Sequence, residues 1–145
     1  MRRTEFITEK RQFSGFSASL LMEKDVVSCS PTDTGQDIAR ILTRINVGSL
    51  PVVDGDKKLA GLVSEFDLLK ALMQGRDLKT LRAGEIMTKA VRTIKESTPV
   101  EEIISLLEEE HLIRVPVERD GKLVGIVARR DVLYGYIKAK EEYWP

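Results

Sequence analysis

Two aspartates occupy matching positions in a motif that occurs twice in the chain. Asp67 ends residues 61–67 (GLVSEFD), and Asp131 ends residues 125–131 (GIVARRD), 64 residues later. Each stretch predicts a buried strand that leads into the first turn of a helix. A fixed carboxylate at such a turn can accept hydrogen bonds from both hydroxyls of a ribose diol, and charge-assisted bonds of this kind are roughly twice as strong as neutral ones. Asp67 and Asp131 are therefore candidate sugar-binding residues.

A purely structural role competes with this interpretation in the first copy. Ser64 and Asp67 have the spacing of a capping box, and an aspartate in a first helical turn stabilises the helix by about 0.3–1 kcal/mol without any ligand. In the second copy Ala128 replaces the serine and cannot cap, yet Asp131 is still present. Ser64 and both aspartates stay in the candidate site, with capping as the alternative.

Basic residues that would suit a phosphate lie in the second copy. The helix that begins near residue 129 offers unpaired N–H groups, and a guanidinium fork matches phosphate oxygens. The candidates are Arg114, His111, Arg129 and Arg130. A helix C-terminus would explain His111 without a ligand, and a solvated face would explain Arg129 and Arg130. The first copy has Gly48 and Ser49 in the places of Ile113 and Arg114, so cationic recognition is asymmetric.

The elements that must position these residues follow one order in each copy. In the first copy we expect a strand at residues 25–29, a helix capped by Asp33 or Thr34, and a hairpin formed by residues 50–53 and 59–63. A second helix follows and ends at Gly75. The expected apolar stripes are Ile38, Ile41, Leu42 and Ile45 on the first helix and Phe66, Leu69, Leu72 and Met73 on the second.

The second copy repeats the order at an offset of 65 residues, which becomes 64 after its hairpin. Asp120 and Gly121 favour a two-residue type I′ turn there, and a deletion costs least in a turn. We therefore predict an α+β fold of two β-α-β-β-α repeats, packed about a pseudo-two-fold axis with a cleft between them. The predicted boundaries are an N-terminal arm at 1–18, repeat 1 at 19–75, a linker at 76–84, repeat 2 at 85–140 and a tail at 141–145.

Composition limits the classes of function. The 23 basic and 23 acidic residues leave no net field for nucleic acid or a membrane surface, and the single cysteine excludes an intrachain disulfide. No stretch predicts a signal peptide or membrane span, so we expect a cytoplasmic protein. One histidine, no catalytic triad spacing, no glycine-rich phosphate loop and no metal-ligand cluster argue against an enzyme and against a metal site.

The repeated motifs resemble the tandem CBS-domain (Bateman-type) module over residues 20–138. The resemblance rests on Met22, Pro51-Val52 and residues 59–67 in the first copy, and on Met87, Pro116-Val117 and residues 123–131 in the second. It implies a stand-alone CBS-pair protein that senses AMP, ADP or ATP, or less favourably S-adenosylmethionine or NAD, in the inter-repeat cleft. It also implies a homodimer that regulates another protein.

The resemblance assigns further residues. Arg114 matches a position that is often basic in nucleotide-binding members, and Thr98 matches a threonine that commonly contacts ribose or phosphate; the alternative for Thr98 is an N-cap with Glu101. Apolar strand ends that would be core residues in either case would hold the adenine, namely Val26, Val27, Val91 and Ile113. The rival hypothesis is a ligand-free interaction scaffold, with exposed helices and Tyr143 and Trp144 binding a partner.

Overall fold

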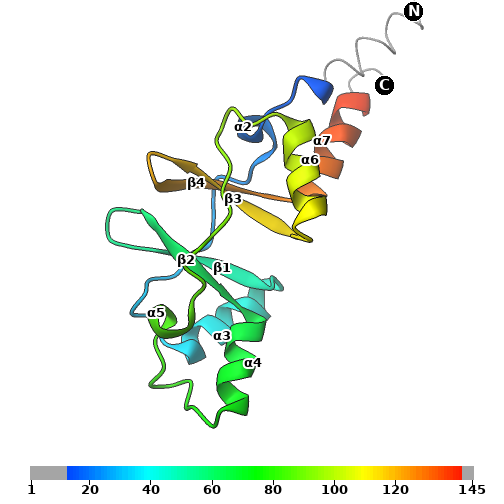
Figure 1. Cartoon of the computed structure of the whole chain (residues 1–145). Coiled ribbons are helices and arrows are strands. Elements are labelled where there is room, and N and C mark those ends of the chain that lie inside the picture. The colour runs from blue at the N-terminus through cyan, green and yellow to red at the C-terminus, as the bar shows by residue number, and fades with distance from the viewer. Residues whose placement is uncertain (1–12, 142–145) are drawn as a thin grey trace, which may run out of the picture. The chain divides into compact units, whose positions relative to one another are not determined.

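A computed structural model describes residues 13–141 and shows a mixed helix and strand chain (Figure 1). Its strands form two separate two-stranded sheets, β1 with β2 and β3 with β4, and β1 and β2 run antiparallel. The predicted α+β class is confirmed. The strands are β1 (Ser49–Val53), β2 (Leu59–Ser64), β3 (Arg114–Arg119) and β4 (Lys122–Ala128). The helices are α2 (Ala18–Leu21), α3 (Gly35–Ile45), α4 (Glu65–Met73), α5 (Ala83–Ile86), α6 (Val100–Glu109) and α7 (Arg129–Glu141).

The strand predicted at residues 25–29 is wrong as an element. Only Cys29 pairs, in a single parallel bridge to Val52, and Ile94 makes the equivalent bridge to Val117 in repeat 2. The ladder stops there because the chain turns at once: the Ser30 N–H donates to Asp33 Oδ2 at 2.8 Å, and Pro31 has no N–H to donate. Each repeat therefore contributes one hairpin, and a single parallel bridge stands where a third strand was expected.

Local signals for turns and caps are confirmed. Thr34 caps α3 by accepting from the Asp37 N–H at 3.1 Å, and Asn46 ends that helix in the left-handed region with φ 56°. Asp120 and Gly121 have φ values of 53° and 81°, as a type I′ turn requires at both central positions.

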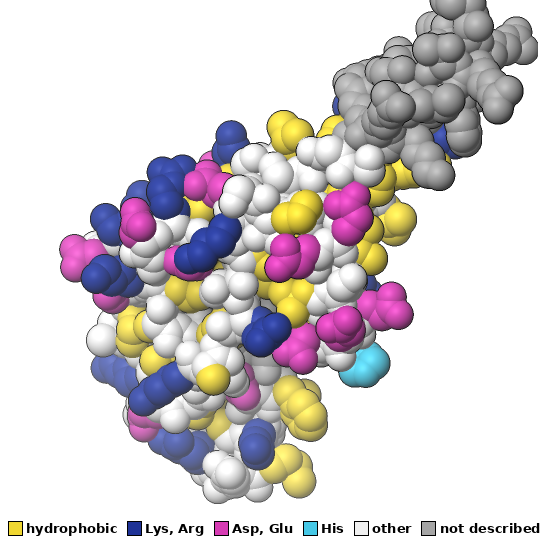
Figure 2. All heavy atoms as spheres, turned by 45° about the horizontal axis from the view of Figure 1, so that its top comes forward, with side chains coloured by type: hydrophobic (Ala, Val, Ile, Leu, Met, Phe, Trp, Pro, Cys, Tyr) yellow, Lys and Arg dark blue, Asp and Glu magenta, His cyan; other side chains and the backbone are white. Residues whose placement is uncertain are grey.

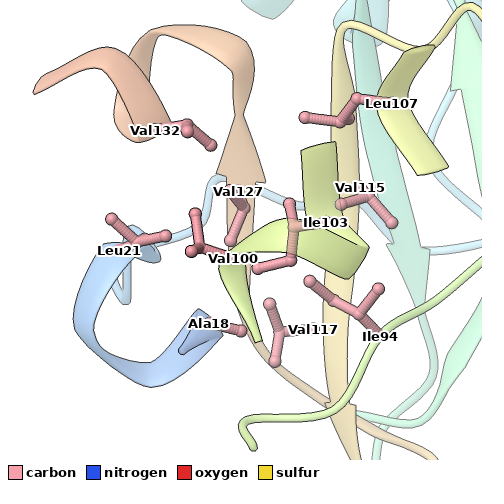
Figure 3. Packing of buried hydrophobic residues seen from close by; sticks show 10 residues of the cluster. All are labelled: Ala18, Leu21, Ile94, Val100, Ile103, Leu107, Val115, Val117, Val127 and Val132. Atoms are coloured by element: carbon pink, nitrogen blue, oxygen red, sulfur yellow. The ribbon is translucent and has the colours of Figure 1, made fainter. Parts of the chain in front are cut away.

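The chain divides into two compact units, each with its own core. The repeat-2 unit contains residues 13–26, 92–119 and 124–141 of the described chain, and the repeat-1 unit contains 27–91 and 120–123. Figure 3 shows the core of the repeat-2 unit, formed by Ala18, Leu21, Ile94, Val100, Ile103, Leu107, Val115, Val117, Val127 and Val132. The core of the repeat-1 unit is formed by Cys29, Ile38, Leu42, Leu50, Val52, Val63, Leu68 and Ala83.

Each unit includes a short segment that lies outside the repeat predicted from the sequence. In the repeat-2 unit the Val100 N–H donates to the Phe16 carbonyl at 2.9 Å, and in the repeat-1 unit the Gly35 N–H donates to the Leu81 carbonyl at 2.8 Å. Phe13 also packs edge-on against Tyr136, with ring centroids 5.2 Å apart. A residue of the predicted arm therefore bonds to the start of α6, and a residue of the predicted linker bonds to the start of α3.

Two glycines allow residues 87–88 and 22–23 to lie close to the hairpins. A Cβ added to Gly61 would lie 2.7 Å from the Thr88 carbonyl oxygen, and one added to Gly125 would lie 2.5 Å from Met22 Sδ. A side chain at either position would therefore force the neighbouring atoms to move. In each unit a strand glycine thus lies next to the methionine that the sequence repeat assigned to the other copy, Gly61 next to Met87 and Gly125 next to Met22.

The predicted apolar stripe of α4 faces away from the core of its unit. Phe66 and Met73 are 77% and 88% exposed, whereas Leu68 and Ala71 are buried. In α7 three of the four equivalent positions, 64 residues on, hold Leu133, Tyr136 and Ile137, which are also exposed, and the fourth holds Arg130. The same face is therefore apolar and uncovered on both post-hairpin helices of the described chain.

Candidate functional site

The two aspartates lie in the first turns of α4 and α7, and both act as helix caps. The Ser64 N–H donates to Asp67 Oδ2 at 2.8 Å, and the Asp67 N–H donates to Ser64 Oγ at 3.1 Å, so the capping box is confirmed. In repeat 2 the Ala128 N–H donates to Asp131 Oδ2 at 2.7 Å. A carboxylate has about four acceptor positions, so one capping bond leaves acceptor capacity. Both carboxyl groups are half-buried.

Arg114 lies close enough to Asp131 for their charges to interact. It is the first residue of β3 and is half-buried. Burial lowers the pKa of the Arg114 guanidinium, and the negative charge of Asp131 opposes that shift. Because the ordinary pKa of a guanidinium is above about 12, Arg114 stays charged at neutral pH. Repeat 2 thus places a cation and a carboxylate together at one end of its hairpin.

The start of α7 adds two more cations to this end of the hairpin. The Arg129 N–H donates to the Ile113 carbonyl at 3.0 Å, which joins the first residue of the helix to the residue before β3. The side chains of Arg129 and Arg130 are both exposed. The backbone contact therefore brings Arg114 next to the first turn of α7, which contains Arg129, Arg130 and Asp131.

His111 lies at the end of α6, beside a groove between α6 and α7. Its φ of 52° places it in the left-handed region, which histidine adopts more readily than most residues. The groove has a volume of about 530 Å³. Its lining residues are Ile104, Leu107, Glu108, His111, Leu112, Arg129, Val132 and Leu133. Figure 2 shows the chain's single histidine, in cyan, at the surface near acidic side chains.

Thr98 is not the N-cap of α6, so that interpretation of the sequence is wrong. The cap is Pro99, and Thr98 Oγ1 instead accepts from the Lys95 N–H, three residues earlier, at 2.9 Å. Asp33 makes the same contact in repeat 1 with the Ser30 N–H. The hydroxyl and the carboxylate thus close equivalent turns, and Thr98 is buried.

The apolar residues proposed for adenine are not core residues, contrary to what the sequence predicted. Val27 and Ile113 are 43% and 60% exposed, and Val26 and Val91 are half-buried. For Val26, Val27 and Val91 the reason is that the strands expected to bury them shrink to single bridges at Cys29 and Ile94, whereas Ile113 lies just before β3. Their contact with a ligand stays a prediction.

One charged residue at the equivalent site of repeat 1 was missed by sequence reasoning. Glu65 is the first residue of α4, and its N–H donates to the Gly48 carbonyl at 2.9 Å, as the Arg129 N–H does to Ile113. The signal was present in the alignment of the two copies, because residue 65 lies 64 positions before residue 129.

The duplicated hairpin and helix, with a capping aspartate in each copy, define a tandem repeat module. The CBS domain family model matches residues 18–74 and 83–138. The chain belongs to the CBS-domain family.

Relatives of known sequence or structure agree with this assignment. An uncharacterized protein of Methanopyrus kandleri is 33% identical over 119 residues, which are 81% of this chain and 61% of that protein. The chain spans only 21% and 23% of the lengths of two further relatives from Methanocaldococcus jannaschii.

Two solved structures are similar to the chain and contain adenosyl ligands. The crystal structure of CBSX2 in complex with AMP has a TM-score of 0.76 and 30% identity, and the match covers 87% of this chain and 99% of that one. The CBS domain pair of the protein MJ0100, in complex with 5-methylthioadenosine and S-adenosyl-L-methionine, has a TM-score of 0.71 and 30% identity, with 83% and 96% covered.

Membrane spans and metal clusters are both absent from residues 13–141. None of the helices in this part of the chain is long and apolar enough to cross a membrane. In the same part, no three His, Cys, Asp or Glu side chains come together as a metal site would require.

Proposed function

We propose that the chain is a regulatory module, not an enzyme, that binds an adenine nucleotide of the AMP, ADP or ATP type at the repeat-2 site. In this proposal Arg114, Arg129 and Arg130 hold the phosphate and Asp131 accepts the ribose hydroxyls. The single observation that carries the proposal is the bond from the Arg129 N–H to the Ile113 carbonyl at 3.0 Å, which brings Arg114 of β3 next to the start of α7, where Asp131 lies.

The cation and the carboxylate together suit a nucleotide better than they suit a phosphate alone or a ribose alone. A half-buried guanidinium forms stronger bonds to phosphate than an exposed one, because less water competes for it. Asp131 places an acceptor for a diol beside that cation. The similar structures that contain AMP, or S-adenosyl-L-methionine and 5-methylthioadenosine, support an adenosyl ligand.

Calorimetric titration of the purified chain with AMP, ATP and S-adenosylmethionine tests the proposal. We expect micromolar binding of AMP or ATP, and loss of that binding in Arg114→Ala. Arg40→Ala is the matched control, since Arg40 is an exposed arginine of α3 whose recorded partner is Asp37. The absence of binding by all three ligands would reject the sensor.

The exposed apolar faces of α4 and α7 favour a second function, in which the module is an interaction or dimerisation scaffold. Equivalent positions are apolar and exposed in both repeats, at Leu69 and Leu133 and at Met73 and Ile137. Apolar side chains gather at the surface in Figure 2 as well. We propose a second copy of this chain as the occupant, because a face repeated in both halves suits a symmetric partner. Dimerisation is compatible with nucleotide sensing, and the assembled dimer would act on the regulated partner protein.

A further inference from the structure

The two repeats carry opposite charges at the start of the helix that follows the hairpin. Glu65 begins α4 and Arg129 begins α7. Each N–H donates to the carbonyl of the residue that precedes the first strand of its hairpin: Glu65 to Gly48 at 2.9 Å and Arg129 to Ile113 at 3.0 Å. The backbones are therefore equivalent, and the difference lies in the side chains.

The carboxylate of Glu65 lies beside Gly48, the residue that precedes the position equivalent to Arg114. A Cβ added to Gly48 would lie 3.4 Å from Glu65 Oε1, so the carboxylate is next to Gly48. Ser49 follows Gly48 and corresponds to Arg114 of repeat 2. Repeat 1 thus has a small polar residue where repeat 2 has the Arg114 guanidinium, and a carboxylate beside the residue before it.

The net charge of four equivalent positions differs strongly between the two repeats. Ser49, Glu65, Phe66 and Asp67 carry two negative charges, whereas Arg114, Arg129, Arg130 and Asp131 carry three positive charges and one negative. A phosphate monoester carries a charge of about −1.5 to −2 at neutral pH, so it is repelled in repeat 1 and attracted in repeat 2. The ribose-type acceptor is present in both repeats, as Asp67 and Asp131.

We propose that Glu65 is a specificity determinant that excludes phosphate from repeat 1, so that the chain binds one nucleotide and binds it in repeat 2. This inference rests on the proposed function, because it assumes that repeat 2 takes a nucleotide. It adds the stoichiometry and names the residue that sets it.

The test moves the phosphate site from repeat 2 to repeat 1. Calorimetric titration of the wild-type chain with AMP is expected to give one site per chain, which Arg114→Ala removes. In the Arg114→Ala background, Ser49→Arg with Glu65→Arg is expected to restore one site. The matched control is Ser49→Arg in the same background with Glu65 retained, for which we expect affinity at least tenfold weaker.

Both replaced residues lie outside the capping box of Ser64 and Asp67, so the helix start should survive, and thermal melting checks this. If Ser49→Arg with Glu65→Arg lowers the melting temperature, a second variant is used. It combines Glu65→Gln with Ser49→Arg and Arg114→Ala, and it removes the negative charge of Glu65 with a smaller change of side chain. It should also bind AMP more tightly than the chain that keeps Glu65.

Equal affinity with and without the Glu65 charge would overturn the inference, and so would two equal AMP sites in the wild-type chain. Either result leaves the proposed function standing, since AMP still binds. A wild-type chain that binds no adenine nucleotide would instead reject the proposed function itself.

Discussion

At the scale of single residues, Asp131 has two tasks that mutation can separate. Its Oδ2 accepts from the Ala128 N–H, which fixes the start of α7, and its charge acts on Arg114. A diol would use the acceptor capacity that the capping bond leaves. Capping alone therefore does not decide between a structural and a functional aspartate, which is why the sequence left both open.

Replacement of Asp131 by asparagine should separate these tasks. The amide of Asp131→Asn keeps an oxygen for the Ala128 N–H, so we expect the free energy of unfolding to change by less than about 0.5 kcal/mol, whereas Asp131→Ala should cost about 1 kcal/mol. Both variants lose the charge-assisted acceptor, and AMP binding should weaken about tenfold in each. Urea denaturation and calorimetric titration measure the two effects. Unchanged AMP affinity in both variants would leave Asp131 as a cap only.

Cys29 should make stability fall at alkaline pH. Burial, with a smaller effect of the Asp33 charge, raises the pKa of the Cys29 thiol to about 12. In the unfolded chain that pKa is about 8.5, so above this value the unfolded state loses a proton that the folded state keeps. The free energy of unfolding should then drop by about 1.4 kcal/mol per pH unit between about pH 8.5 and 12.

Comparison with Cys29→Ala isolates this effect from the titration of lysines and tyrosines. The variant loses packing at every pH but lacks the thiol, so its deficit relative to wild type should shrink as the pH rises above the thiol's unfolded-state pKa of about 8.5. Urea unfolding at several pH values gives both curves. Parallel curves would show that the thiol does not titrate differently in the two states.

At the scale of elements, the hairpins and their helices follow from signals in the sequence. Asp120-Gly121 predicts the turn that forms, and Thr34 and Asn46 mark the ends of α3. The prediction of a strand at residues 25–29 failed because residue alternation and β-branched residues cannot show whether a neighbouring strand is available for pairing. The supporting segments were missed because Phe16 and Leu81 lie in stretches without periodicity, although they are 65 residues apart like the rest of the repeat.

Gly61→Ala should test the contact between β2 and residues 87–88. The added Cβ would lie 2.7 Å from the Thr88 carbonyl oxygen, and relief requires a backbone shift, which typically costs about 1–3 kcal/mol. Gly55→Ala is the control, since no heavy atom lies within 4 Å of its added Cβ. We expect a lower melting temperature for the first variant and an unchanged one for the second. Equal melting temperatures would contradict the close approach.

At the scale of the whole molecule, duplication explains why one chain has two similar sites of unequal character. The shared hairpin and helix start supply the carboxylate twice, while residues 114, 129 and 130 supply cations only in repeat 2. Sequence reasoning found the family and the candidate residues of repeat 2. It did not single out Glu65, whose carboxylate lies beside Gly48 in the structure.

Dimerisation through the exposed faces of α4 and α7 can be measured directly. Light scattering should give about twice the chain mass of 16.3 kDa. Leu69→Glu with Leu133→Glu should yield monomers, because charges would replace apolar side chains at the buried interface. Leu20→Glu is the control, since Leu20 is 69% exposed on α2. A dimer that survives the double change would place the interface elsewhere.

The central claim, that repeat 2 binds an adenine nucleotide, is tested most directly by a crystal structure of the chain grown with AMP. We expect one AMP per chain, with its phosphate on Arg114 and its ribose hydroxyls on Asp131. AMP bound at Ser49 and Asp67 instead, or crystals in which saturating AMP leaves the Arg114 and Asp131 side chains without a nucleotide, would contradict it.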